Sequence, residues 1–206
     1  MELDLDAIKG AHAVCRRLGI TSKSKMRDRR PTLDELDKIL TRFGVVEGRR
    51  SGIAPMQKIV AFAIFSTRRQ EEITRILWSD LEPGRVLVRD MKHPGDKIGN
   101  DTWCDLVPEA EKVIASMPKT APEIFPVGTD AISAAFTRAC QFLEIEDLHF
   151  HDLRHDGVSR LFEMGWNIPQ VSAVSGHRSW QSLKRYTHLR HTGDKYAGWK
   201  WLEEIT

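Results

Sequence analysis

Near the carboxyl end of this 206-residue chain, four polar side chains occur in an order that suits chemistry on a phosphate group. His151 and Arg154 form a His-x-x-Arg pair, His177 follows a glycine, and Tyr186 stands nine residues after His177. If a helix begins near the first pair, residues three apart point to one side of its first turn. A guanidinium in that position can bind two phosphate oxygens at once.

Helix signals in the same stretch indicate how these groups are brought together. Asn167, with Pro169 two residues later, is typical of a helix start, and Ser179 predicts the cap of a further short helix that carries Tyr186. Glycines end the two preceding helices. Three short helices can therefore gather the four polar groups at one point. Lys184 and Arg185 beside Tyr186 are expected to favour its phenolate form.

This ordered set resembles the carboxyl-terminal half of the active site of the tyrosine recombinases, the phage integrase family. The family pattern is His-x-x-Arg, then Gly-His, then a tyrosine nine residues later, and His151, Arg154, His177 and Tyr186 match it. The resemblance extends over about residues 32–190. It implies a site-specific DNA recombinase or integrase, an enzyme that breaks and rejoins DNA.

The family's first catalytic arginine lies in a segment that reads Thr-Gly-Leu-Arg-x-x-Glu, with Trp-x-Asp downstream. Counting back from Trp78 places this arginine at Arg69 and the acidic residue at Glu72. Arg68 then occupies the family's apolar position, so the choice between Arg68 and Arg69 stays open. Without the resemblance, the favoured interpretation of two arginines after an apolar helix is a solvated helix terminus whose charges interact with the helix dipole. Glu72 is expected to hold Arg69 or a histidine in place.

A β-hairpin is predicted for residues 86–91 and 101–107, which alternate as strands on either side of a polar loop. In the family this hairpin bears a catalytic lysine that protonates the leaving oxygen. Lys92 matches it by position, and Lys97 is the second candidate. The alternative for either residue is a solvated lysine of the loop.

The resemblance implies phosphoryl transfer by a tyrosine nucleophile. Tyr186 would attack the scissile phosphate, displace the 5′-oxygen and leave a 3′-phosphotyrosyl link that keeps the energy for rejoining. Arg69, Arg154 and His177 would bind the non-bridging oxygens as charge develops, and His151 would accept the tyrosine proton. Such a reaction requires no metal, no ATP and no other cofactor.

Residues 16–30 are strongly basic, with seven Arg and Lys residues against one Asp. This segment is interpreted either as a solvated, flexible linker or as positive charge lying along DNA phosphates, and both can hold together. The candidate DNA-binding residues are Arg16, Arg17, Lys23, Lys25, Arg27, Arg29 and Arg30.

The expected partner is double-stranded DNA at an attachment or recombination site. The resemblance also implies a homo-oligomer, a tetramer on DNA. The tryptophan-rich tail near the C-terminus would be an apolar patch if exposed, so it docks either on its own domain or, as often in the family, on an adjacent subunit. Only about 30 residues precede Thr32, where family members carry a separate DNA-clamping domain, so tight and specific DNA binding is not expected from this piece alone.

The predicted fold is α+β, mostly α, with a small antiparallel sheet or hairpin, as in the catalytic domain of a tyrosine recombinase. Thr32 and Glu35 form a capping box for a helix that Gly44 is expected to end, and the apolar residues after Pro55 predict a central buried helix. The expected division is residues 1–30 as an arm of one short helix plus the basic linker, 31–191 as the catalytic domain and 192–206 as a C-terminal tail.

Composition limits the class of protein. A hydrophobic content of 41% is ample for a core, and the three cysteines are too few and too scattered for a disulfide framework or a zinc site. No apolar run approaches the roughly 18 residues of a membrane span, and the acidic N-terminus is unlike a signal peptide. A cytoplasmic location without membrane association is expected.

Two other functions are compatible with parts of the sequence. His149 and His151 alternate as they would on a strand, which is how a metal-dependent single-strand DNA nickase of the His-hydrophobe-His type presents its ligands. The helical pattern that follows weakens this interpretation. The other alternative is a non-catalytic DNA-binding or assembly remnant of a recombinase, against which the intact set of site residues argues.

Overall fold

A computed structural model of the chain describes residues 10–11, 14–15, 17–18, 27–49, 54–91 and 99–206. The helix expected near the N-terminus falls mostly outside these residues. The elements described here are α2 (Leu33–Glu47), α3 (Met56–Ser66), α4 (Gln70–Ile73), η1 (Trp78–Asp80), β1 (Leu81–Glu82), β2 (Arg85–Val88), β3 (Thr102–Asp105), α5 (Pro108–Ala115), α6 (Thr129–Phe142), α7 (Phe150–Glu163), α8 (Ile168–Ser175), α9 (Trp180–Leu183), η2 (Lys184–Tyr186) and α10 (Lys200–Ile205). The predicted α+β class, mostly α, is confirmed.

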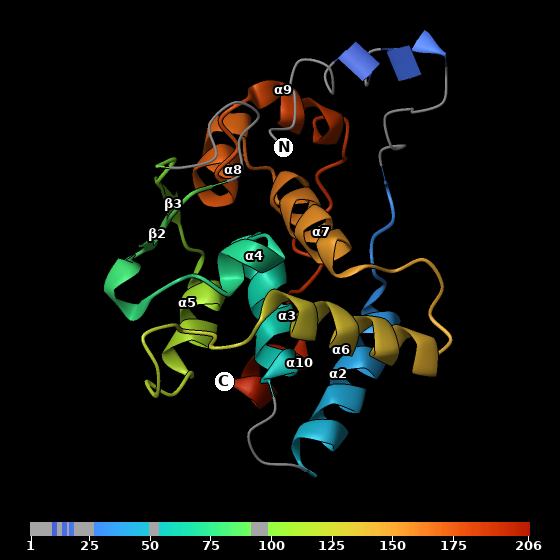
Figure 1. Cartoon of the computed structure of the whole chain (residues 1–206), viewed down its shortest axis with the longest axis vertical. Helices are drawn as coiled ribbons and strands as arrows, with labels where there is room; N and C mark the ends of the chain where they lie inside the picture. Colours follow the sequence, from blue (N-terminus) through green and yellow to red (C-terminus); the bar gives the residue numbers. More distant parts are fainter. Residues whose placement is uncertain (1–9, 12–13, 16, 19–26, 50–53, 92–98) are drawn as a thin grey trace, which may run out of the picture.

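Helix α3 is the centre of the core. It is apolar around its whole circumference and contacts α2, α4, α5, α7 and α10, and Figure 1 shows it in the middle of the molecule with α8 and α9 at one end. Its closest neighbour is α7, where a Cβ atom on Gly157 would lie 2.0 Å from the carbonyl oxygen of Ile64. Only glycine permits this backbone approach, so Gly157 sets the distance between α3 and the helix that carries the His-x-x-Arg pair.

Helix α2 begins as predicted but ends later. The capping box is present, because Thr32 Oγ1 accepts from the Glu35 amide at 3.1 Å and Glu35 accepts from the Thr32 amide at 2.8 Å. The prediction that Gly44 ends the helix is wrong, since α2 continues to Glu47. Gly44 instead makes room for the Gln57 side chain, whose amide donates to the Leu40 carbonyl at 2.9 Å.

The sheet is antiparallel with strand order β1-β2-β3. In the predicted hairpin Val86 pairs with Cys104 and Val88 with Thr102, and the side chains of Val86, Val88 and Cys104 are buried. Sequence analysis missed β1, because two residues are too few to show an alternating pattern. Residues 92–98, between β2 and β3, lie outside the described part of the chain.

The C-terminal tail packs against its own domain. Tyr196, Trp199 and Trp201 are buried, and the Trp201 indole donates to Asp37 Oδ1 of α2 at 2.7 Å. The Tyr196 hydroxyl donates to Asp156 of α7. Of the two docking modes considered, the structure therefore has the intramolecular one, and the tail does not form a separate apolar patch.

Among the described residues, no helix combines the length and apolar character that crossing a membrane requires.

Truncation of the chain after Lys195 is predicted to destroy its cooperative unfolding. The deletion removes Tyr196, Trp199, Trp201 and Ile205, each buried. Burial of one large apolar side chain is worth roughly 1.5–3 kcal/mol, and a whole domain is stable by only about 5–15 kcal/mol. Urea unfolding followed by tryptophan fluorescence and circular dichroism measures the effect. Glu204→Ala, on an exposed position of the same helix, is the control and should unfold like the parent chain. A truncated chain with the parent's midpoint would contradict intramolecular docking.

Candidate active site

The two arginines after α3 have different surroundings. Thr67 ends α3 in the left-handed region, with φ of 57°, and Arg68 and Arg69 follow it directly. Arg68 is 1% exposed, its Nε donates to the Ser66 carbonyl at 3.1 Å, and its guanidinium also donates to the Val174 carbonyl. Arg68 thus ties α8 to the end of α3. The side chain of Arg69 is 27% exposed, so Arg69 is the arginine of the pair that a ligand can reach.

Glu72 is the buried carboxylate of the site. Its oxygens lie 2.7 Å from Arg69 Nη1, 3.7 Å from Arg68 Nη1 and 4.0 Å from Arg154 Nη1. Burial by itself would raise the pKa of Glu72, but the charges of Arg68, Arg154 and Arg69 outweigh it and lower the pKa to about 2. Glu72 is therefore ionised, and three guanidiniums face one carboxylate. The excess positive charge makes this place a site for an anion.

Arg154 lies in the second turn of α7 and its side chain is buried. It donates to the carbonyl of Thr67 and, at 3.1 Å, to the carbonyl of Ser175. These carbonyls stand at the C-terminal ends of α3 and α8, where helix dipoles favour a cation. Burial and the charge of Arg69 nevertheless lower the pKa of Arg154 from its usual value. An added anion would offset that cost.

His177 completes the cluster from the end of α8. Gly176 ends that helix with φ of 69°, as predicted, and the His177 ring then lies with Nε2 3.2 Å from Arg154 Nη2 and Nδ1 2.7 Å from Ser175 Oγ. Burial and the charge of Arg154 lower the pKa of His177 to about 3. The imidazole is therefore neutral near pH 7, and it can donate an N–H to an oxygen anion without giving up a proton.

His151 stands apart from this hydrogen-bonded cluster. It lies on the first turn of α7, three residues before Arg154, and is exposed to solvent. The helix begins at Phe150 because the amide of His149 donates to Asp152 at 2.8 Å. His149 and His151 thus belong to a helix start, and the alternating strand that a His-hydrophobe-His nickase needs is not formed. No group of three His, Cys, Asp or Glu residues that could hold a metal occurs within the described ranges.

Tyr186 is buried beside α7. Its ring stacks on Phe162, with ring planes 7° apart, and its hydroxyl lies 3.1 Å from Nδ1 of His155. Burial raises the pKa of Tyr186, and the opposing charge of Arg185 does not outweigh it. Arg185 thus favours the phenolate, as expected, but burial has the larger effect because the helix that carries Tyr186 turns its ring into the protein.

His155 is the residue at this site that sequence reasoning missed. It directly follows Arg154 on α7, and its side chain is 12% exposed. No motif pointed to it, because the His-x-x-Arg part of the family pattern ends at the arginine and the next matched residue is Gly176. The available signal was its spacing of four residues from His151, which puts both imidazoles on one helix face.

Three arginines predicted to bind DNA instead pair with carboxylates of this chain. Arg27 Nη2 lies 2.9 Å from Asp152 and Arg30 Nε 2.7 Å from Asp156, both on α7. Arg29 pairs with Glu35. A phosphate contact by any of these arginines requires its ion pair to open, so their DNA-binding role stays a prediction. Arg17 is exposed, and the remaining predicted residues outside the described part are Arg16, Lys23, Lys25, Lys92 and the alternative Lys97.

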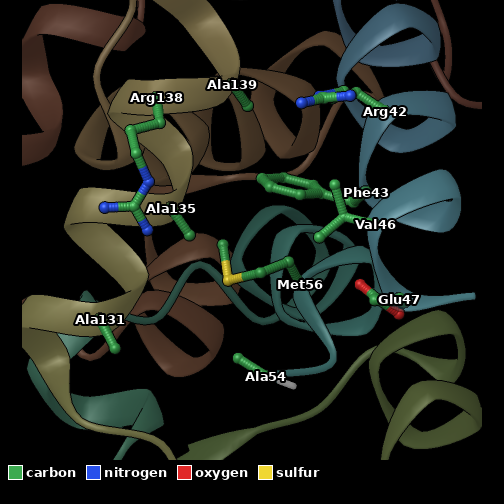
Figure 2. Close-up of a pocket in the computed structure, with 10 residues that line it drawn as sticks. All are labelled: Arg42, Phe43, Val46, Glu47, Ala54, Met56, Ala131, Ala135, Arg138 and Ala139. Atoms are coloured by element: carbon green, nitrogen blue, oxygen red, sulfur yellow. The ribbon is translucent and has the colours of Figure 1, made fainter. Parts of the chain in front are cut away.

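A separate hollow lies between α2, the start of α3 and α6 (Figure 2). Its floor includes Phe43, Met56 and Ala135, and Arg42 and Arg138 stand at its sides. None of its lining residues belongs to the cluster around Glu72, so this hollow is not part of the candidate active site.

Comparison with known sequences gives one consistent family. The sequence model described as "Phage integrase family" matches residues 104–192. A shufflon-specific DNA recombinase of Escherichia coli is 36% identical over 170 residues, which cover 81% of this chain and 42% of that protein. The integrase of Salmonella phage P22 is 26% identical over 153 residues, covering 66% of this chain and 39% of that protein. The chain thus spans about two fifths of the length of these relatives.

Solved structures share the fold. A lambda integrase dimer bound to a COC′ core site superposes with a TM-score of 0.64 at 21% identity, over 88% of this chain and 56% of that one. The XerA recombinase gives a TM-score of 0.59 at 19% identity, over 91% of this chain and 70% of that one. The family match over residues 104–192, the recombinase homologue and this shared fold together show that the chain belongs to the phage integrase family of tyrosine recombinases.

Proposed function

We propose that this chain is the catalytic part of a site-specific DNA recombinase that cleaves and rejoins DNA through a 3′-phosphotyrosyl intermediate. The observation that carries the proposal is the anion site made by Arg69, Arg154 and His177 over the buried Glu72. Tyr186 supports it, because its hydroxyl is held by the residue that follows Arg154. Membership of the family and the arrangement of these side chains support the same reaction.

In the proposed reaction the Tyr186 oxygen bonds to phosphorus while the bond from phosphorus to the 5′-oxygen breaks. Arg69 and Arg154 bind the non-bridging oxygens as their charge grows, and the neutral His177 donates an N–H to them. The tyrosine proton passes to a histidine of α7: the resemblance indicates His151, and the hydroxyl contact indicates His155. On sequence grounds alone, Lys92 protonates the 5′-oxygen.

Glu72 sets the strength of the site in this proposal. Without a carboxylate, three guanidiniums would repel one another strongly in a buried position. One carboxylate reduces this repulsion, but the cluster keeps a net positive charge. The phosphate diester supplies negative charge, so the same electrostatics that orient Arg69 and Arg154 also favour binding of the substrate.

Double-stranded DNA at a recombination site is the proposed partner, with a homo-oligomer, a tetramer, as the active form on DNA. One structure with this fold is a lambda integrase tetramer bound to a Holliday junction, which supports such an assembly. The tail of this chain packs against its own domain. A tail contact with an adjacent subunit would therefore require α10 and Tyr196 to leave the contacts described above.

The nucleophile can be tested cleanly, because the chain has only two tyrosines. The wild-type chain, incubated with a pool of nicked duplexes of randomised flanking sequence, should form an adduct that survives denaturing electrophoresis. Tyr186→Phe, which removes one oxygen and little volume, should abolish the adduct. Tyr196→Phe, the matched control, loses the hydrogen bond to Asp156 and about 1–3 kcal/mol of stability, but should still form it. The nucleotide should be recovered on a peptide containing Tyr186, linked through its 3′-phosphate. A link to Tyr196 or through a 5′-phosphate would refute the mechanism.

A metal chelator distinguishes this mechanism from a nickase. The proposed charge stabilisation comes from two guanidiniums and an imidazole, so adduct formation should continue at an unchanged rate in excess EDTA. The measurement is the initial rate of adduct formation with and without the chelator. Loss of the adduct in EDTA, with recovery on addition of Mg²⁺ or Mn²⁺, would contradict the proposal.

A further inference from the structure

Tyr186 has a hydrogen-bond partner outside the residues of the family pattern. Its hydroxyl lies 3.1 Å from Nδ1 of His155, and the two rings meet edge to face with centroids 5.1 Å apart. His151, the residue that the resemblance indicates, is exposed one helical turn earlier. The proton of the nucleophile is therefore next to His155 in this structure.

His155 has the protonation state that an acceptor needs. Burial, then Arg185 of η2 and Arg30 of the N-terminal segment, lower its pKa below the usual 6.5. Asp28 of the same segment and Asp152 on α7 oppose this shift but do not outweigh it. Near pH 7 the imidazole is neutral, so one ring nitrogen carries a proton and the other can accept one.

Asp28 favours the tautomer that leaves Nδ1 free. Its carboxylate oxygen lies 4.0 Å from Nε2 of His155, on the side of the ring opposite to Tyr186. This distance is too long for a hydrogen bond, so Asp28 acts on His155 through its charge, which favours the proton on the nearer nitrogen. Asp28 is itself held by Arg185, whose Nη2 lies 2.5 Å from its oxygen. A carboxylate, an imidazole and a hydroxyl thus follow one another, as they do where a histidine activates an oxygen nucleophile, but here only the imidazole and the hydroxyl are within hydrogen-bond distance.

We propose that His155 is a further catalytic residue of this site, which accepts the phenolic proton of Tyr186 at Nδ1 as the tyrosine oxygen bonds to the phosphate. Asp28 is a positioning residue that acts through His155. In rejoining, the 5′-hydroxyl gives its proton back to the group that supplied it, proposed above as Lys92, and its oxygen bonds to phosphorus. The bond from phosphorus to the tyrosine oxygen breaks, and His155 returns the proton to that oxygen. The cycle balances without any added reactant. It rests on the proposed function, since it assigns a group to the same reaction.

The pH dependence of adduct formation separates His155 from His151. With a nicked duplex recovered from the randomised pool, the wild-type rate should be constant near neutral pH and fall as pH drops through the pKa of His155, below 6.5. His155→Gln keeps a hydrogen-bond acceptor but cannot take a proton, so it should slow the reaction by about a hundredfold at pH 7. Its rate should then rise about tenfold per pH unit as hydroxide replaces the imidazole. His188→Gln, at an exposed histidine outside the proposed site, is the matched control and should keep the wild-type rate and pH profile. In His151→Gln the acid limb set by His155 should remain.

Two outcomes would overturn the assignment. One is a His155→Gln variant with the wild-type rate and pH profile, which would reduce His155 to a structural contact. The other is loss of the profile in His151→Gln alone, which would give the role to His151. Asp28→Asn should move the acid limb to lower pH, because it removes a carboxylate that raises the pKa of His155. Asp34→Asn, on the exposed side of α2, should not.

A measurement without DNA keeps this test independent of the proposed function. In a Tyr196→Phe background, ¹³C labelling of tyrosine leaves a single ring signal, that of Tyr186. Its chemical shift should follow the titration of His155, keep doing so in His151→Gln, and lose the dependence in His155→Gln. A Tyr186 signal that ignores His155 would refute the proposed contact. Absence of any DNA adduct from the wild-type chain, beside a normal NMR titration, would instead refute the recombinase function.

Discussion

One buried carboxylate holds the site together. Glu72 lies within 4.0 Å of Arg68, Arg69 and Arg154, which come from the end of α3, the start of α4 and the middle of α7. Three guanidiniums this close would repel one another without it, and the pKa of Glu72 near 2 means that it stays charged at any ordinary pH. The arrangement leaves a surplus of positive charge at the surface end of the cluster. The remaining repulsion among the guanidiniums favours the binding of an anion there, because an anion would reduce it.

Helix α7 contacts the candidate active site on one side and the two terminal segments on another. Its Gly157 lets it approach α3 closely, and Arg154 then reaches the carbonyls at the ends of α3 and α8. On another face of α7, the fully buried Asp156 accepts hydrogen bonds from Arg30 at 2.7 Å and from Lys195 at 2.8 Å. Asp156 therefore joins the N-terminal segment to the C-terminal tail. The arginines of residues 27–30 therefore stabilise the fold, and the single acid among them, Asp28, comes to lie beside His155.

Local sequence signals and matched motifs predicted the helices and the candidate site residues, but they did not predict the long-range charge contacts. Capping residues and glycines gave the short helices around His177 and Tyr186, because such signals act within a few residues. The spacing from Trp78 selected Arg69, but why Arg68 can stand on an apolar position was not predictable. It is buried because Val174, over a hundred residues away, accepts its hydrogen bond. The pairing of Arg27 and Arg30 with α7 was missed for the same reason, since a basic run reads as solvated until its distant carboxylates are known.

The protonation states in the site are consistent with one sequence of events. Positive charge and burial keep His177 neutral, and burial keeps the phenol of Tyr186 protonated. In the proposed reaction, a phosphate bound between Arg69 and Arg154 would bring negative charge and so would raise the pKa of the nearby histidines. A histidine then becomes a better proton acceptor when the substrate is present than when it is absent. In the proposed reaction the charge surplus around Glu72 would thus link substrate binding to activation of the nucleophile, because both would depend on the same added negative charge.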